Sequence, residues 1–186
     1  MLNSQKMPAT NSGFTLIELM IAVVILGIVM AMGISSYRVW IQNTAVRNVA
    51  ESVLNGLQLA RAEAVKRNVP MQFNFRAGSA WTVCQRPVAL GACPDPDDAT
   101  TIQSRTQTEG ASTNVTVTTA PAANTSISFN NLGQVDTTVT SFTQVVVDNS
   151  ILSVADKRIL RLVVNVGGST RMCDPKFAYA TDPRGC

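Results

Sequence analysis

The sequence contains no histidine, few aromatic residues and few charged residues. Of its 186 residues, 5% are aromatic and 15% are charged. Without histidine, a serine or cysteine nucleophile lacks its usual imidazole base, so a hydrolase with an ordinary catalytic triad is excluded. The formal charge of +3 is too small to require an anionic partner. We therefore expect no enzymatic activity and no cofactor.

The four cysteines lack the spacing of a metal site. There is no Cys-x-x-Cys pair and no histidine ligand, which argues against zinc. Cys84 lies close to Cys93 in the sequence, and Cys173 lies close to Cys186, so the spacing favours two local disulfides among the three possible pairings. Both bonds would form in an oxidising periplasm, and the second would hold the C-terminus in place. No metal is expected at the cysteines.

One long apolar run, residues 14–37, contains a single charged side chain, Glu18. About 20 helical residues cover the roughly 30 Å hydrocarbon core of a bilayer, so this run is long enough to span one. A charge near the bilayer interior costs roughly 2.5–3.5 kcal/mol on insertion scales. Glu18 therefore requires a partner, and we interpret it as an assembly residue.

A small residue lies before this apolar run rather than after it. A secretory signal is cut at a small-residue site beyond its apolar segment. Here Gly13 precedes the run and ends a polar leader whose only charged side chain is Lys6. Cleavage after Gly13 would remove residues 1–13 and leave the hydrophobic segment on the mature protein. The alternative is a plain signal anchor in which Glu18 is incidental.

Residues 13–18, with the sequence GFTLIE, resemble the type IV prepilin signature, and the apolar continuation also fits it. The resemblance implies cleavage between Gly13 and Phe14 by a prepilin peptidase, followed by N-methylation of Phe14. It also implies that Glu18 pairs with the N-terminal amine of a neighbouring subunit in a filament. An amine and a carboxylate attract strongly at low dielectric constant, and each offsets the desolvation of the other.

The sequence beyond the apolar run predicts a second helical half with one apolar stripe. Apolar residues recur at three- and four-residue spacing, and Asn68 and Pro70 then supply a stop. We predict one helix of about 50 residues, from Phe14 to about Arg67. A following sheet must cover its apolar stripe, which comprises Val46, Val49, Ala50, Val53, Leu57, Ala60 and Ala64.

The rest of the chain is typical of strands joined by turns. Alternating side chains in residues 71–76 predict a strand with one face on the helix. Residues 158–166 are the strongest strand candidate and are expected to be central. The end of the chain, residues 174–185, is predicted to be a loop. Further strands are predicted at residues 81–84, 102–106, 114–118, 126–130 and 144–148, with turns at 131–133 and 167–169.

Parts of this C-terminal region resemble minor pilins and pseudopilins of the GspH and FimT group. The resemblance implies an α+β fold, in which a long N-terminal helix packs on a small antiparallel β domain closed by disulfides. Four parts are expected: a leader at residues 1–13, a transmembrane or filament-core half-helix at 14–37, an amphipathic half-helix at 38–68 and a β-rich periplasmic domain at 69–186. The resembling segments are residues 57–67, 127–133, 171–175 and 182–186.

Basic residues lie in or beside the proposed Cys173–Cys186 loop, namely Arg171, Lys176 and Arg184. Clusters of lysine and arginine contact phosphates. Some FimT-like minor pilins bind DNA through a Gly-Arg-x-Arg motif in this region, of which only Arg171 is retained here. The simpler interpretation is that these residues belong to the surface of a closing loop, and DNA contact is the alternative.

The sequence as a whole predicts a minor pilin of a type IV pilus, within its priming or tip complex. It would cross the bacterial inner membrane once, with its C-terminal domain in the periplasm, and then join other major and minor pilins in the pilus fibre. A DNA-binding minor pilin for uptake and a pseudopilin of type II secretion are the alternatives. Asp95, Asp97 and Asp98 could bind Ca²⁺, although adjacent acids in a proline-containing loop are more often simply solvated.

Overall fold

The computed structural model describes residues 13–88, 91–94, 98–109 and 113–186. The chain divides into two compact units, Met1–Arg38 and Val39–Cys186. One helix, α1, spans Leu16–Arg67 and contributes to both units. Its bounds agree with the predicted helix to within two residues at the start and match it at the end.

The first unit contains the start of α1, and its apolar side chains are exposed on every side of the helix. Leu26, for example, is 54% exposed. When α1 is divided into its two segments, Leu16–Ala31 and Ser36–Arg67, neither segment is long and apolar enough on its own to cross a membrane. No other helix in the described residues is either, and these two segments meet the requirements of length and composition only when they are taken together.

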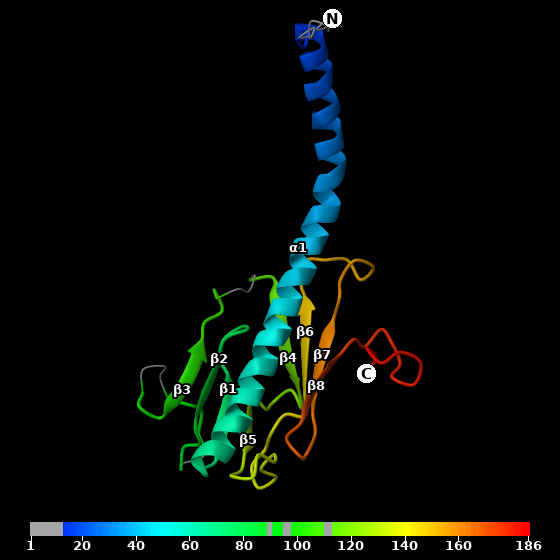
Figure 1. Cartoon of the computed structure of the whole chain (residues 1–186). Coiled ribbons are helices and arrows are strands. Elements are labelled where there is room, and N and C mark those ends of the chain that lie inside the picture. Colours follow the sequence, from blue (N-terminus) through cyan, green and yellow to red (C-terminus); the bar gives the residue numbers. More distant parts are fainter. Residues whose placement is uncertain (1–12, 89–90, 95–97, 110–112) are drawn as a thin grey trace, which may run out of the picture. The chain divides into compact units, whose positions relative to one another are not determined.

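The second unit buries the apolar stripe of α1, as predicted. Every residue of the stripe is at most 4% exposed. Figure 1 shows this part of α1 lying across the strands. The helix approaches the Phe73 ring closely at Gly56, where an added Cβ would lie 2.7 Å from a ring carbon of Phe73. The helix ends where the sequence predicts, because Asn68 adopts a left-handed conformation with φ of 55° and Pro70 follows.

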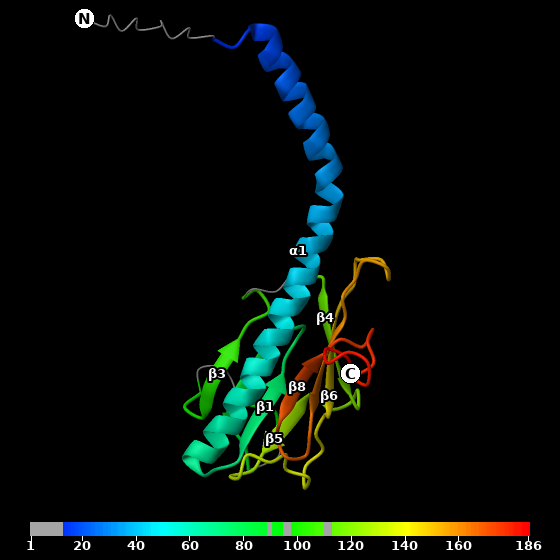
Figure 2. The same ribbon diagram turned by 45° about the vertical axis from the view of Figure 1, so that its right-hand side comes forward.

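Eight strands in the described residues form two antiparallel sheets (Figures 1 and 2). The first sheet has the order β3-β2-β1-β5, and the second has the order β4-β6-β7-β8. The strands of the first sheet are β1 (Met71–Phe75), β2 (Trp81–Gln85), β3 (Thr101–Arg105) and β5 (Ser126–Phe129), and those of the second are β4 (Val115–Ala120), β6 (Gln144–Asn149), β7 (Leu160–Val164) and β8 (Thr170–Cys173).

Strand β1 departs from the prediction, because both of its faces are buried. Phe73 stacks on Trp81, whose indole Nε1 donates a hydrogen bond to Ser52 of α1 at 2.9 Å. The polar side chain of Gln72 is also buried and donates to the carbonyl of Gly91 at 3.0 Å. A loop closed by a disulfide therefore covers a side of the sheet that alternation alone assigned to solvent.

Two further differences from the prediction lie in the second sheet. Strand β7 starts later than residue 158, because the amide of Arg158 donates to the side chain of Asn43 at 2.8 Å instead of joining a ladder. It ends at Val164, where the amide of Asn165 donates to the carbonyl of Ser169 at 2.9 Å in the following turn. It is nevertheless an interior strand, as expected. Strand β8 was not predicted. It has only four residues and is specified by antiparallel pairing with β7, not by its own pattern.

Candidate functional site

Thr15 and Glu18 form the start of α1. The side-chain oxygen of Thr15 accepts a hydrogen bond from the amide of Glu18 at 3.3 Å, and the carbonyl of Thr15 accepts one from the amide of Leu19 at 3.2 Å. A threonine followed three residues later by glutamate is the pattern of a capping box. A negative charge in the first turn is also favoured by the helix dipole. The GFTLIE motif therefore contains the start of α1 and the threonine that caps it.

The carboxylate of Glu18 has no ion-pair partner among the residues that the structure describes. It lies within the exposed apolar half of α1, between the exposed side chains of Ile17 and Leu19. Gly13 and Phe14 precede the helix and have no regular secondary structure. An unpaired carboxylate on such a surface can accept a positive group from a second molecule.

Two disulfides are present in the second unit, with the pairing that the spacing favours. Cys84 is bonded to Cys93, and their Cα atoms are 5.7 Å apart. Cys173 is bonded to Cys186, with a Cα separation of 5.1 Å. With all four sulfurs in disulfides, none is available as a thiolate ligand for zinc. The second bond closes the C-terminal loop, residues 174–185, against the end of β8.

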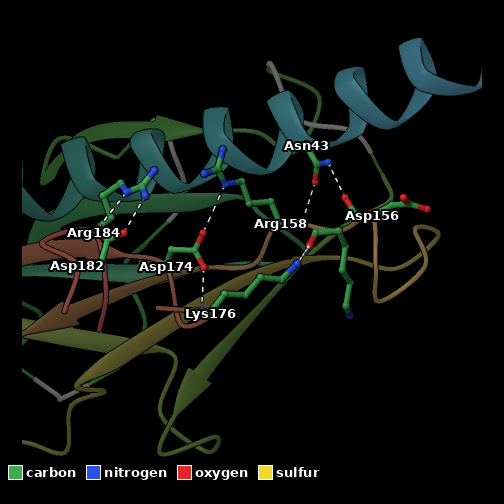
Figure 3. Close-up of polar contacts among 8 residues, drawn as sticks. Asn43, Asp156, Arg158, Asp174, Lys176, Asp182 and Arg184 are labelled. Carbon is green, nitrogen blue, oxygen red and sulfur yellow. Dashed lines mark hydrogen bonds and ion pairs between the residues drawn. The ribbon is translucent and has the colours of Figure 1, made fainter. Parts of the chain in front are cut away.

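Arg184, in the C-terminal loop, is held by a carboxylate two residues before it. Its guanidinium donates to both oxygens of Asp182, at 3.1 and 2.7 Å, and lies 4.9 Å from the centre of the Phe177 ring. These hydrogen bonds lower the pKa of Asp182 to about 2 and raise the pKa of Arg184. The pair, drawn in Figure 3, neutralises one of the three cations proposed to contact DNA.

The other two of these cations also have partners within the domain. Arg171, on β8, lies 4.4 Å from the centre of the Tyr179 ring. The Lys176 ammonium donates to the carbonyl of Lys157 at 3.0 Å. The structure therefore places all three cations in or beside the C-terminal loop, as expected, but each one is engaged with its own domain.

A groove of about 490 Å³ lies between α1 and the C-terminal loop. Trp40 and Arg47 line it from α1, while Arg158, Asp174 and Arg184 line it from the other side. Arg47 pairs with Glu51 at 2.7 Å, and Arg158 pairs with Asp174 at 3.5 Å. The groove is thus close to electrically balanced. No sequence signal could have identified it, because its walls are more than a hundred residues apart in the chain.

The structure describes only one of the three acids considered for Ca²⁺. Asp95 and Asp97 lie outside the described residues. Asp98 accepts hydrogen bonds from the amide and the hydroxyl of Thr100, at 2.8 and 2.6 Å. These bonds lower the pKa of Asp98. Asp98 therefore fixes the turn that leads into β3.

Comparison with known proteins gives two matches to family models. The model described as type II transport protein GspH matches residues 49–168. The model described as prokaryotic N-terminal methylation motif matches residues 9–34. No curated protein matches the chain significantly.

Two crystal structures of the type IV minor pilin FimU from Pseudomonas aeruginosa are similar to this chain. The first, in space group P21, has 13% identity and a TM-score of 0.49, and the match covers 68% of this chain and 87% of that chain. The second, in space group P65, has 15% identity and a TM-score of 0.45, and covers 68% and 90%.

Proposed function

We propose that this chain, which belongs to the GspH family, is a minor pilin that joins a type IV pilus. The family and the N-terminal methylation motif make the chain a type IV minor pilin or a pseudopilin. A place in the priming or tip complex of a pilus is the narrower part of the proposal. The role is structural, as expected for this family, and not catalytic.

The proposed processing follows from the order of residues at the start of the chain. A prepilin peptidase cuts between Gly13 and Phe14, and the new N-terminal amine on Phe14 is then methylated. The cut removes the polar leader and creates a positive group four residues before Glu18. One motif thus supplies both halves of an ion pair, the amine of one subunit and the carboxylate of another.

The observation that carries this proposal is the Glu18 carboxylate, which has no ion-pair partner in the described part of the chain and lies on an exposed apolar helix. Before assembly, the apolar half of α1 would lie in the inner membrane, with the domain from Val39 onward in the periplasm. After extraction, the same side chains would pack against other major and minor pilins in the filament core. In that core an amine from a neighbouring subunit would offset the desolvation of Glu18.

The assembly role is tested by replacing Glu18 with alanine in the full chain. Removing one member of a buried ion pair typically costs about 3–5 kcal/mol. We therefore expect the Glu18→Ala protein to be cleaved and to stay in the membrane fraction, but to be absent from sheared filaments. Immunoblots of membrane and filament fractions measure both quantities, and mass spectrometry of the mature N-terminus checks cleavage and methylation at Phe14.

Glu51 provides the matched control, because it is a glutamate on the same helix that already pairs with Arg47 at 2.7 Å within the domain. The Glu51→Ala protein should enter filaments normally, since an exposed i,i+4 pair contributes only a few tenths of a kcal/mol. Normal incorporation of the Glu18→Ala protein would contradict the assembly role. Absence of both variants from the filaments would instead indicate that either substitution disturbs the helix as a whole.

A pseudopilin of type II secretion is the second candidate, and the GspH description of the matching family favours it. The proposed cut, methylation and ion pair would be the same in that system. Deleting the gene in its host separates the two: loss of surface pili supports the pilus, whereas loss of protein secretion with pili intact supports the secretion system. We do not propose DNA binding, because Arg171, Lys176 and Arg184 each have a partner within the domain.

A further inference from the structure

We propose that the loop between β6 and β7, residues 150–159, contacts the surface of the lipid bilayer while the chain is anchored in the membrane. The inference rests on the proposed function, because it requires the apolar half of α1 to lie in a membrane. The occupant that we assign to this loop is the interface of a phospholipid bilayer, into which the apolar tip of the loop inserts.

The β6–β7 loop lies beside the start of α1 in the second unit (Figures 1 and 2), and its tip carries exposed apolar side chains. Ile151 is 61% exposed and Val154 is 78% exposed. On α1 itself, Trp40 is 61% exposed, and Ile41 is exposed as well. Exposed apolar side chains of this kind can enter the apolar part of a lipid interface.

The loop is fixed in place by polar groups that face inward. The side chain of Asn43 donates to the carbonyl of Asp156 and accepts from the amide of Arg158, both at 2.8 Å (Figure 3). At the other end of the loop, the buried side chain of Asn149 donates to Gln42 at 2.9 Å and accepts from the amide of Ile151 at 3.0 Å. These bonds hold the loop against α1 and leave its apolar tip facing outward.

The loop is within reach of the bilayer because of its covalent distance from the apolar run. Asn43, which holds the loop, follows Tyr37, the last residue of that run, by six residues. Six residues span at most about 22 Å even when fully extended, and less in a helix. Trp40 lies between them, and tryptophan is enriched at the interface between membrane and water. This short connection allows the tip to reach the headgroup region.

The charges around the loop indicate that contact depends on apolar insertion and not on anionic lipids. Lys157 pairs with Asp148 at 2.6 Å, and Arg158 pairs with Asp174 at 3.5 Å. Paired cations offer little attraction to an anionic surface. We therefore expect the contact to change little with salt concentration or with the fraction of anionic lipid.

The size of the apolar tip favours a bilayer over a protein partner. A specific protein interface buries on the order of 1,000 Å² or more and needs a complementary surface. The tip supplies two protruding side chains, Ile151 and Val154, which are far less than that area. A fluid lipid interface needs no complementary shape, and small apolar protrusions can enter it.

The test places a fluorescent reporter on the tip of the loop in the full chain. Trp40→Phe removes the exposed tryptophan, and the buried Trp81 remains as a constant background. Ile151→Trp or Val154→Trp is then added, and the chain is reconstituted in phosphatidylethanolamine and phosphatidylglycerol vesicles with brominated acyl chains. Leu132→Trp is the matched control, because Leu132 is 70% exposed and its neighbour Asn131 bonds to Asn68 at the far end of α1.

We expect bromine to quench the Ile151→Trp and Val154→Trp reporters several-fold more than the Leu132→Trp reporter, at low and high salt alike. Equal weak quenching of all three, in chains that float with the vesicles, would overturn the inference and leave the proposed function intact. Chains that fail to float would contradict the membrane step of the proposed function itself. Protection of the tip only in assembled filaments would overturn the lipid assignment in favour of a neighbouring subunit.

Discussion

The two halves of α1, up to Arg38 and from Val39 onward, are both rich in apolar residues but differ in what surrounds those residues. In the first half, Leu26 is 54% exposed, and apolar residues on all sides of the helix are similarly uncovered. In the second half, Leu57 is completely buried. There, two sheets and the ring of Phe73 cover one stripe, while most of the remaining positions carry polar side chains and a few, such as Val65, are exposed apolar residues.

This difference shows which parts of the helix depend on other molecules. In the second half, the same chain provides the apolar environment, so burial contributes to the stability of the monomer. In the first half, the described residues provide no such cover, and under the proposed function lipid or other subunits supply it. A leucine is therefore a folding residue in one half and, under the proposed function, an assembly residue in the other.

The largest expected effect comes from shortening a leucine in each half. Leu57→Ala leaves a cavity in the core and should lower the free energy of unfolding by about 2–5 kcal/mol. Leu26→Ala should change it by no more than about 0.5 kcal/mol, because that side chain is exposed. Urea unfolding of the full chain in detergent, followed through tryptophan fluorescence in a Trp40→Phe background that leaves Trp81 as the reporter, measures both. A large effect of Leu26→Ala would remove the distinction between the halves.

A smaller loss of stability is expected from a substitution at Gly168, where the second half of α1 meets two turns of the β domain. Gly168 has a φ of 80°, and an added Cβ would lie 1.9 Å from the carbonyl oxygen of Gly133. That oxygen also accepts a hydrogen bond from Arg61 of α1 at 3.1 Å. Gly168→Ala should therefore cost about 2–4 kcal/mol through backbone strain and overpacking.

Gly167 is the control for this substitution, because it is the adjacent glycine and an added Cβ there meets nothing within 4 Å. Gly167→Ala should change the free energy of unfolding by about 0.5 kcal/mol or less. The same urea titration compares the two variants. Equal stability of both would mean that the two turns adjust freely, and that Arg61 does not anchor them closely to α1.

The smallest expected effect lies at the edge of the second unit, in the pair of Asp182 and Arg184. Because the pKa of Asp182 is lowered to about 2 from an ordinary 3.8, the pair stabilises the folded state above about pH 4. This contribution is lost as the pH falls from about 4 towards 2. Asp182→Asn should thus be slightly less stable than the parent near neutral pH, and the difference should shrink through pH 2 and vanish below it. Thermal unfolding at several pH values measures it, and a constant difference would contradict the assignment.

Much of the fold could be predicted because it depends on patterns close together in the sequence. The three- and four-residue spacing of the apolar stripe predicted a buried helix face, and Val53 and Leu57 are fully buried. Asn68 and Pro70 predicted the end of α1, because each disfavours a further helical turn. The disulfide pairing followed from short separations, since nearby cysteines meet at little entropic cost.

The remaining features depend on contacts between distant residues. Strand β8 has four residues and too little pattern to be recognised, and it exists because β7 provides its hydrogen-bonding partner. The second face of β1 is buried because the loop closed by Cys84 and Cys93 folds over Gln72. The groove beside Trp40 joins residues from α1 and the chain end. Local periodicity contains no information about such neighbours.

The sequence by itself determined the GFTLIE motif with Glu18, and the long helix with an apolar first half and a striped second half. These features are local, because a motif is a short run of residues and a helix is set by contacts three or four residues apart. Only the tertiary structure decided that Arg171, Lys176 and Arg184 are engaged within the domain, and that Asn43 holds an apolar loop beside α1. Whether a side chain is paired or presented to another molecule depends on which distant residues packing brings to it.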